Sequence, residues 1–181
     1  AANVATLRAR GIAVLDPADG RLAGADTGRG RLPDPSVIAA AALALLGPRD
    51  LEGRSAVVSA GGTREALDPV RFLGNRSSGR QGVAVADALA ARGARVPAVA
   101  AQPAADPAGA IKHRVVTVVS ARDLELAVEA ESRNADIVVM AAAVADYRPA
   151  QVQDAKMKKT GEALRLELIE NPDILTGLVA R

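Results

Sequence analysis

Residues 55–82 read SAVVSAGGTREALDPVRFLGNRSSGRQG, and the architecture of the chain can be worked out from this segment. Its apolar run at 55–60 leads directly into a Gly-Gly-Thr turn, and after a long loop over 67–76 we expect a helix over 77–92. Apolar strands that alternate with helices are typical of a parallel sheet covered by helices on both faces. The pattern therefore predicts an α/β fold, a Rossmann-like three-layer sandwich with a mostly parallel sheet. Further runs of this kind, each an expected strand, follow at 94–101, 115–119 and 137–143.

Capping residues predict where helices begin. Asp34 and Pro35 are expected to open a helix that runs to about Leu46, because proline at the first helical position has no N–H to lose. Ser120 and Asp123 have the spacing of a capping box, in which each residue satisfies a backbone N–H of the other. The sequence therefore predicts a helix start at each of these two places.

Composition divides the chain into three parts. Residues 1–46 form the first part, with a Gly-rich, charged loop expected over 20–31. Residues 47–54 are polar and are expected to form a linker, and residues 55–181 carry the alternating pattern. The chain ends at Arg181 within its last expected helix, so we expect the domain over 55–181 to be incomplete.

The C-terminal part is more polar than the segments before it. Residues 151–162 are polar and lysine-rich, unlike an element of the core. Leu164, Leu166 and Leu168 alternate with other residues in the pattern of a half-buried strand. The Asn-Pro pair at 171–172 is then expected to provide the cap and first residue of another helix.

Composition also excludes several classes of function. The chain has 181 residues, of which 49% are hydrophobic and 24% charged, the balance of a globular protein. It has no cysteine, which excludes thiol nucleophiles and zinc–thiolate sites. Its apolar runs are shorter than the roughly 18–20 residues that span a bilayer, so we expect a cytoplasmic protein without a membrane partner. The net charge is only +2 and aromatic residues make up 1%, so we expect no nucleic-acid partner.

Open parallel sheets bind ligands at the carboxyl ends of their strands, and an unusual segment follows the first strand. Gly61 and Gly62 allow backbone N–H groups to approach an anion closely, and Thr63 adds a hydroxyl donor. The glycine spacing is that of neither a dinucleotide fingerprint nor a Walker A loop. The alternative interpretation is a tight turn, which Gly-Gly pairs form for conformational reasons alone.

A second segment, at 75–82, lies at the start of the next helix. Ser77 and Ser78 can cap this helix, and the free N–H groups at a helix start favour phosphate. An ordinary serine cap is the alternative, but Arg71 and Arg76 at the same entrance favour an anion site. The two segments together predict adjacent cradles of phosphate size.

A third segment follows the last apolar strand, at 141–149. Its small residues leave room for a flat ligand, and Asp146 can accept hydrogen bonds from ribose hydroxyls or a base amino group. A small-residue packing site with a surface aspartate is the alternative. The lysines of 156–159 form either a solvated loop or a cationic loop that neutralises a triphosphate. The sole histidine, His113, has no partner histidine and is expected to be structural.

The motifs of the chain resemble those of phosphopantothenate–cysteine ligase. The strings AGGTREALDPVRFLGNRSSGRQG at 60–82, MAAAVADYRPA at 140–150, KMKK at 156–159 and NPDIL at 171–175 stand in the order of that family. They cover nearly all of the chain after the expected linker. In bacteria this enzyme is usually the second half of a bifunctional coenzyme A biosynthesis protein. Residues 3–32 resemble the C-terminal end of the flavin-dependent decarboxylase that forms the first half.

The resemblance implies a reaction and its participants. The substrates would be 4′-phosphopantothenate, cysteine and CTP, with an acyl cytidylate as intermediate and Mg²⁺ accompanying the triphosphate. FMN would belong only to the decarboxylase half, and decarboxylation is not expected, because Gly24 stands where many relatives have a cysteine. We expect a homodimer through the ligase half and a higher oligomer in the bifunctional protein. The metal ligands, the preference for CTP over ATP and the activity of this chain by itself stay open.

The resemblance also implies roles for individual residues. Asn75 and Lys156 are the expected catalytic residues: Asn75 handles the acyl cytidylate, and Lys156 acts on the phosphates during activation. Arg71, together with Asn75 and Ala143, is expected to bind phosphopantothenate. The expected nucleotide-binding residues are Gly61, Gly62, Ser78, Ala142, Ala143, Asp146, Lys156 and Lys159.

Two other classes of function stay open on the sequence. A nicotinamide-dinucleotide-binding oxidoreductase is disfavoured by the glycine spacing and by the absence of an acidic residue over 98–102, at the end of the second expected strand. A non-catalytic role in assembly is favoured by the expected incompleteness of the domain.

Overall fold

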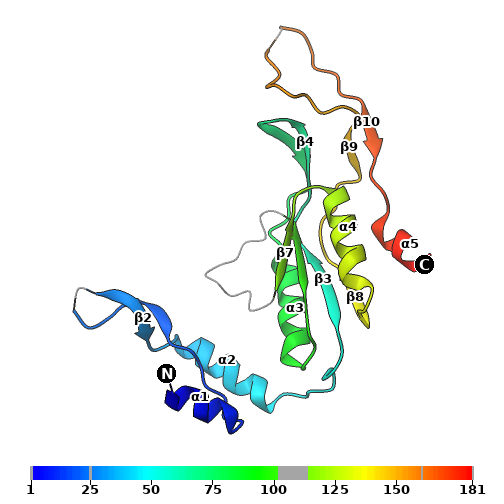
Figure 1. The fold of residues 1–181 in the computed structure, drawn as a ribbon. Coiled ribbons are helices and arrows are strands. Elements are labelled where there is room, and N and C mark those ends of the chain that lie inside the picture. Colours follow the sequence, from blue (N-terminus) through cyan, green and yellow to red (C-terminus); the bar gives the residue numbers. More distant parts are fainter. Residues whose placement is uncertain (1, 25, 102–113, 160, 181) are drawn as a thin grey trace. The chain divides into compact units, whose positions relative to one another are not determined.

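The computed structural model describes residues 2–24, 26–101, 114–159 and 161–180, and the chain divides into two compact units, Ala1–Pro48 and Arg49–Arg181 (Figure 1). Residues 49–54, expected to lie in the linker, therefore belong to the second unit. The first unit contains α1 (Ala2–Ala9), β1 (Ala18–Arg21), β2 (Thr27–Arg31) and α2 (Pro35–Leu46).

Helix α2 begins where the sequence predicts. The side chain of Asp34 accepts a hydrogen bond from the backbone N–H of Ser36 at 2.9 Å, and Pro35 occupies the first turn. The prediction of a loop over 20–31 is wrong, because β1 and β2 pair there as an antiparallel hairpin. The side chain of Leu22 packs beside Gly28 and Gly30, which stand two residues apart on one face of β2. Composition alone did not reveal this pairing.

The second unit is built around a four-stranded parallel sheet in the order β7-β6-β3-β8. Helices flank this sheet, which confirms the predicted α/β Rossmann-like architecture (Figure 1). The elements of this unit are β3 (Ala56–Ala60), β4 (Arg64–Asp68), β5 (Arg71–Gly74), α3 (Arg80–Ala91), β6 (Ala98–Ala101), β7 (Val115–Val118), α4 (Ala121–Ser132), β8 (Ile137–Met140), β9 (Tyr147–Pro149), β10 (Leu168–Glu170) and α5 (Ile174–Val179).

Every residue of strand β3 is buried. Successive side chains of a strand point to opposite sides of the sheet, so both faces of β3 are covered. Val57 joins one hydrophobic cluster, which includes Leu124 of α4. Ala56 and Val58 join a second cluster, which includes Ala86 of α3. The continuous apolar run at 55–60 is therefore explained by two separate cores, one on each face of the sheet.

Several boundaries differ from those expected. A β4–β5 hairpin replaces the loop expected over 67–76. Strand β8 is half-buried rather than enclosed on both faces, because it forms an edge of the four-stranded sheet. Strand β10 covers only 168–170 and is exposed, so the half-buried strand expected from the leucine alternation is wrong. Helix α5 is capped by Asp173, whose side chain accepts from the Thr176 N–H at 3.0 Å, and not by the Asn-Pro pair.

The strand order places a topological switch point between β3 and β8. The chain leaves β3 for β6 and β7 on one side, and returns through α4 to β8 on the other. Open α/β sheets bind ligands beyond the carboxyl ends of the strands at such a point. Figure 1 shows β4, β9 and β10 beyond this end of the sheet. Within the described residues, no helix has both the length and the apolar character needed to cross a bilayer.

Candidate functional site

The Gly-Gly turn after β3 is a place of close backbone approach. Gly61 has φ +86°, and a Cβ atom placed on it would lie 2.0 Å from the carbonyl oxygen of Ala101. A Cβ on Gly62 would lie 2.6 Å from the carbonyl oxygen of Asn75. Only glycine fits either position without moving the backbone. The turn thus has the conformational role that the sequence left as an alternative, and it brings Asn75 to the end of β3.

Backbone hydrogen bonds join this turn to the segment after β8. The N–H of Ala143 donates to the carbonyl of Gly61 at 2.8 Å, and the N–H of Thr63 donates to the carbonyl of Ala143 at 3.2 Å. Gly62 and Ala143 form a parallel bridge. The ends of β3 and β8, which are far apart in the sequence, therefore form one continuous surface.

Two buried hydroxyl groups shape the segment after β8. The Ser59 Oγ accepts from the N–H groups of Ala141 and Ala142, both at 3.1 Å. The Thr63 Oγ1 accepts from the N–H of Ala145 at 2.9 Å. The expectation that the Thr63 hydroxyl serves an external anion is therefore wrong, since this side chain is fully buried and holds the neighbouring loop. The sequence signal for Ser59 was a polar residue inside an apolar strand.

Asn75 lies at the same corner, with its side chain exposed. Its Nδ2 donates to the carbonyl of Val144 at 2.9 Å, which ties the β5–α3 connection to the loop after β8. An amide side chain has two N–H donors and one acceptor oxygen. One donor is committed to Val144. Among the residues that the structure describes, nothing bonds the other N–H or the Oδ1, so both can bind a ligand.

The start of α3 is not capped by a serine, which the sequence left as the alternative interpretation. The helix begins at Arg80, and its N-cap is Gly79, with φ +73° and no side-chain hydrogen bond. The Ser77 Oγ accepts instead from the Gly79 N–H at 3.3 Å, and Ser78 is exposed. The first N–H groups of a helix have no intrahelical partner, and the helix dipole is positive at this end. Without a capping side chain, this helix start is open to an anion.

Gly82 brings α3 close to β3. A Cβ on Gly82 would lie 2.6 Å from the Cβ of Ala60 and 2.7 Å from the carbonyl oxygen of Ser59. The first turn of α3 is therefore packed directly on the end of β3. The only sequence signal for this contact was a glycine near the start of the expected helix.

A cavity of about 540 Å³ opens beside the loop after β8. Its lining includes Ala142, Asp146, Asn171 and residues of α5. The Asn171 Nδ2 donates to the carbonyl of Ala145 at 2.8 Å, and its backbone N–H donates to the carbonyl of Asp146 at 2.7 Å. Asn171 therefore acts as the anchor of this loop rather than as a helix cap. The carboxylate of Asp146 is exposed at the cavity.

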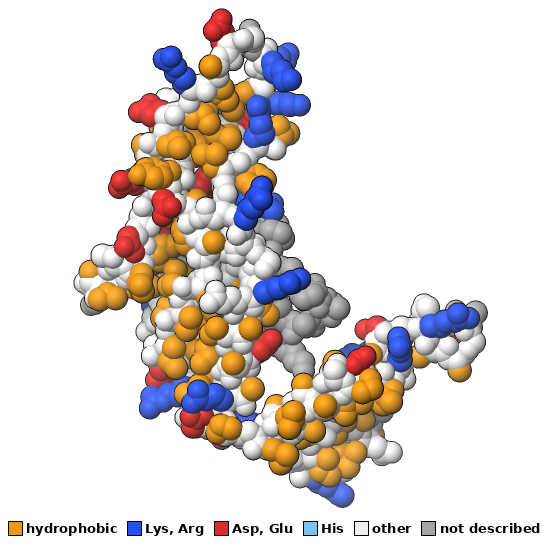
Figure 2. Space-filling model, turned by 180° about the vertical axis from the view of Figure 1, so that it is seen from behind, with side chains coloured by type: hydrophobic (Ala, Val, Ile, Leu, Met, Phe, Trp, Pro, Cys, Tyr) orange, Lys and Arg blue, Asp and Glu red, His pale blue; other side chains and the backbone are white. Residues whose placement is uncertain are grey.

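The lysine segment 156–159 lies against the β4–β5 hairpin, where it contacts Arg71 at the start of β5. The Arg71 guanidinium pairs with Asp68 at 2.6 Å and donates to the carbonyl of Met157 at 2.5 Å. Lys156 and Lys159 are exposed and form no ion pair within the described part of the chain. Figure 2 shows basic side chains gathered along one side of this end of the second unit, and acidic ones mainly along the other.

The structure therefore brings most of the predicted site residues together, in two groups. The first group surrounds the corner between β3 and β8, and consists of Gly61, Gly62, Asn75, Ala142, Ala143 and Asp146. The second is at the hairpin, and consists of Arg71, Lys156 and Lys159. Among the described residues, the lysine segment contacts the hairpin and not the Gly-Gly turn. His113 and Gln102 lie outside the described residues.

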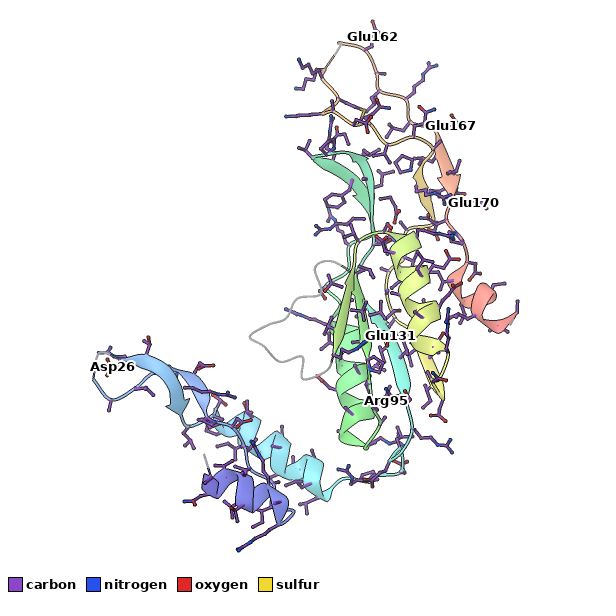
Figure 3. All side chains as sticks on the ribbon, viewed as in Figure 1. Asp26, Arg95, Glu131, Glu162, Glu167 and Glu170 are labelled. Atoms are coloured by element: carbon purple, nitrogen blue, oxygen red, sulfur yellow. The ribbon has the colours of Figure 1, made fainter. Side chains whose placement is uncertain are left out.

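A second cavity, of about 550 Å³, is lined by residues that include Arg95, Arg114 and Glu131. Figure 3 shows Arg95 and Glu131 toward the opposite end of the unit from Glu167. Ligands of open α/β sheets bind at the carboxyl ends of the strands, so this second cavity is not the candidate site.

The described residues offer no ready-made metal cage. No group of three or more His, Asp and Glu side chains among them is arranged to hold a metal ion. Mg²⁺ bound with a nucleotide takes several of its ligands from water and phosphate oxygens. We therefore assign no residue of the described chain as a ligand of Mg²⁺.

Comparison with known proteins identifies relatives of the whole sequence. The profile of the family described as DNA/pantothenate metabolism flavoprotein C-terminal domain matches residues 51–181. The coenzyme A biosynthesis bifunctional protein CoaBC of Mycobacterium bovis is 55% identical over 185 residues, which cover 98% of this chain and 44% of that protein. CoaBC of Vibrio vulnificus is 39% identical over 180 residues, with the same coverage of 98% and 44%. The chain thus spans less than half the length of these relatives.

Solved structures give the same picture of the fold. The crystal structure of the C-terminal domain of CoaBC matches with a TM-score of 0.59 at 38% identity, over 70% of this chain and 58% of that one. A Cab2 variant in complex with phosphopantothenate-cysteine matches with a TM-score of 0.59 at 17% identity, over 81% of this chain and 68% of that one. At this low identity the second likeness establishes the fold alone.

Proposed function

The chain belongs to the DNA/pantothenate metabolism flavoprotein C-terminal domain family, and from this premise we propose that it joins 4′-phosphopantothenate to cysteine at the expense of CTP. The reaction would serve coenzyme A biosynthesis, the process named for relatives that are 55% identical to this chain. The observation that carries the proposal is the meeting of Gly62, Asn75 and the loop before Asp146 at the switch point of the sheet.

The first step activates a carboxylate, which does not react with an amine at neutral pH. A carboxylate oxygen of 4′-phosphopantothenate attacks the α-phosphorus of CTP, and the bond from that phosphorus to the bridging oxygen of the β-phosphate breaks. Pyrophosphate leaves, and an acyl cytidylate is formed. The protein has to align two anions and offset their charge, which fixed N–H dipoles and cations do well.

The open start of α3 supports a phosphate position next to the Gly-Gly turn. Its first N–H groups, which have no capping side chain among the described residues, and its positive dipole end lie one short segment after Asn75. The cavity beside Asp146 supports a position for the ribose and base, because its carboxylate can accept hydrogen bonds there. The small side chains of Ala142 and Ala143 leave this side of the corner uncrowded.

The second step forms the amide. The amino nitrogen of cysteine attacks the acyl carbon, the bond from that carbon to the phosphate oxygen breaks, CMP leaves, and the nitrogen loses a proton. The free N–H of Asn75 is suited to bind the acyl oxygen as negative charge develops on it, since its amide plane is held by Val144. This donor would stabilise the transition state of the second step.

We also propose a homodimer that uses the β4–β5 hairpin. Val70 and Phe72 on this hairpin are 60% and 51% exposed. Apolar surface that stays exposed is common at interfaces between subunits. A second copy of the chain would cover these two side chains.

The test is to incubate the purified chain with CTP, Mg²⁺ and 4′-phosphopantothenate and to measure pyrophosphate. We expect release that depends on 4′-phosphopantothenate, followed by CMP release when cysteine is added. Pyrophosphate release without a need for 4′-phosphopantothenate, or no release at all, would contradict the proposal. Oxidation of NADH or NADPH, measured in parallel, would support the oxidoreductase alternative instead.

A further inference from the structure

Asp68 is a buried carboxylate with an unusually full set of donors. Its side chain is 0% exposed, although it lies on a two-stranded hairpin at the margin of the unit. The Oδ1 accepts from the backbone N–H groups of Val70 and Arg71, at 2.9 and 2.8 Å. The Oδ2 accepts from the Nε of Arg71 at 2.9 Å and from the backbone N–H of Met157 at 3.1 Å.

These donors determine the charge of Asp68. Burial by itself raises the pKa of its carboxyl group, but the hydrogen bonds from Val70, Met157 and Arg71 outweigh burial and lower the pKa to about 2. The carboxylate is therefore ionised at neutral pH. An ionised acceptor makes hydrogen bonds that are shorter and stronger than those of a neutral one.

Met157 is held at both of its backbone polar groups. Its N–H donates to Asp68, and its carbonyl accepts from the Nη2 of Arg71, which is itself paired with Asp68. The two hairpin residues thus bind both backbone polar groups of one residue, Met157, which lies 89 residues from Asp68 in the sequence. The N–H of Gln153 donates to the carbonyl of Leu67 at 3.0 Å and gives the segment a second attachment to the same hairpin.

We propose that Asp68 and Arg71 form a clamp on Met157 that sets the position of the lysine segment 156–159, with Asp68 as a positioning residue for activation by CTP. The part that concerns CTP rests on the proposed function. Lys156 and Lys158 are the immediate neighbours of Met157, so their backbone is fixed within one residue of the clamp. The Nε and Nη2 of Arg71 take part in the clamp, which gives this residue a structural role in addition to the substrate contact expected of it.

The clamp matters because little else holds this segment. Residues 154–156 and 158–159 are exposed, and Met157 is only partly buried. Lysine side chains lose much rotamer freedom when they are ordered on a ligand. If the backbone is already fixed, binding of the triphosphate has to order only the lysine side chains, which lowers the entropic cost of binding.

A first experiment tests the clamp without any nucleotide. Trypsin cleaves after the lysines of 156–159 only when the segment opens, and the cleavage rate reports the population of the open form. We expect Asp68→Asn to raise the rate of cleavage there by about tenfold or more. The matched control is Asp136→Asn, because Asp136 also accepts from a backbone N–H and a guanidinium, those of Ser55 and Arg54, at the other end of the sheet.

Asp136→Asn should change cleavage in the lysine segment by less than about twofold at equal global stability, checked by urea unfolding. Equal cleavage rates in the wild-type chain and Asp68→Asn would overturn the clamp. Arg71→Lys is the second variant, since it keeps the charge of a side chain that is 42% exposed; its fold is checked by the same urea unfolding. Arg71→Lys should also raise the rate of cleavage in the lysine segment, because a lysine lacks the planar guanidinium that reaches both Asp68 and Met157.

A second experiment asks whether Asp68 acts through the lysines. Pyrophosphate release is measured for Asp68→Asn, Lys156→Gln and the double variant. We expect Asp68→Asn to slow release by about tenfold alone but by less than about twofold when Lys156 is already replaced, because residues that act through one another are not additive. Full additivity would assign Asp68 a purely structural role and overturn the proposal. If the wild-type chain released no pyrophosphate, the proposed function would fail, whereas the trypsin result would still decide the clamp.

Discussion

Gly61 is the residue at which the backbone leaves least room. Its positive φ of +86° is disfavoured for any residue with a Cβ, and that Cβ would overlap the carbonyl oxygen of Ala101 at 2.0 Å. We expect Gly61→Ala to lower the free energy of unfolding by about 3 kcal/mol or more, the sum of backbone strain and overpacking. Urea unfolding followed by circular dichroism measures this change.

Gly177 provides the matched control for Gly61. It lies inside α5, and a Cβ placed on it would meet nothing within 4 Å. Gly177→Ala should raise the free energy of unfolding by about 0.5–1 kcal/mol, because alanine is the better helix former. Equal effects of the two substitutions would show that close approach at the Gly-Gly turn does not constrain the fold.

Asn75 is the residue on which the second chemical step depends in our proposal. In Asn75→Asp the donor to the Val144 carbonyl is lost and a negative charge faces the acyl cytidylate. We expect the acyl cytidylate to accumulate, with CMP release slowed by about 100-fold, a loss typical of one removed oxyanion donor. Chromatography of quenched reactions measures both species. Asn134→Asp adds the same charge at an exposed turn and should change neither rate; normal CMP release in Asn75→Asp would remove this residue from the site.

Lys156 is the residue that our proposal assigns to the first step. Lys156→Gln removes a cation from the segment beside the hairpin but keeps a side chain of similar length. We expect pyrophosphate release to slow by about tenfold or more, because the developing charge on the phosphates loses a partner. Arg133→Gln, an exposed cation after α4, is the control for the loss of charge. Unchanged release in Lys156→Gln would leave the lysine segment as an ordinary solvated loop.

At the scale of elements, α4 and α3 begin in different ways. The side chains of Ser120 and Asp123 form a complete capping box at the start of α4, as the sequence predicts. Helix α3 starts at Gly79 without any side-chain cap. One helix start is therefore satisfied within the protein, and the other is left open to a ligand. The sequence predicts the capping box of α4, whereas at α3 it favours an anion site and keeps a serine cap as the alternative.

This difference leads to a prediction for two serines. Ser120→Ala should lower the free energy of unfolding by about 1 kcal/mol, the usual value of an N-cap. Ser78→Ala should change it by less than about 0.5 kcal/mol, the typical effect of a surface substitution, since Ser78 is exposed and makes no cap. Thermal and urea unfolding measure both. A loss in Ser78→Ala as large as that in Ser120→Ala would mean that α3 is serine-capped after all.

The β4–β5 hairpin shows how an element can escape a sequence pattern. The segment that contains Asp68 and Pro69 was expected to be a loop because it is interrupted by turn residues and charge. In the structure it is held by contacts from three directions. The Glu65 Oε1 accepts from the N–H of Ala121 at the start of α4, Leu67 accepts from the lysine-rich segment, and Asp68 closes the turn. The contacts of Glu65 and Leu67 join residues far apart in the sequence, so no local pattern predicts them.

At the scale of the whole molecule, acid should unfold the second unit. Burial alone raises the pKa of Asp68, but its hydrogen bonds outweigh burial and lower it to about 2. A hydrogen bond to Arg92 lowers the pKa of Asp50, and backbone N–H donors lower those of Asp123, Asp136 and Asp173. A carboxyl group with a lowered pKa in the folded state stabilises the fold above its unfolded pKa of about 4. This stabilisation is lost as the pH falls through the folded pKa.

We therefore expect the urea midpoint to be level near pH 6 and to fall steadily between about pH 4 and pH 2. Circular dichroism at a series of pH values measures this. Asp68→Asn should show a lower midpoint at pH 6 and a shallower fall below pH 4, because one of the contributing groups is gone. A wild-type midpoint that stays constant from pH 5 to pH 2.5 would contradict the assignment of these pKa shifts.

Much of the fold could be predicted because its signals are local. The apolar run before Gly61 is long enough for one strand, and the structure confirms a buried strand there. The Asp34 cap and the Ser120–Asp123 box depend on atoms within one helical turn. The hairpins at 18–31 and 64–74 were missed for the opposite reason, since their strands are short, polar and rich in turn residues.

The amino-acid sequence by itself determined the alternation of strands and helices in the parallel sheet, two helix caps and a glycine corner at a strand end, because each depends on residues that are neighbours along the chain. Only the tertiary structure decided the partners of the buried polar groups. Thr63 holds Ala145 from 82 residues away, and Asp68 holds Met157 from 89 residues away. Such pairs form only when the parallel sheet has brought distant strand ends together, since a buried polar atom must find a partner wherever the packed chain provides one.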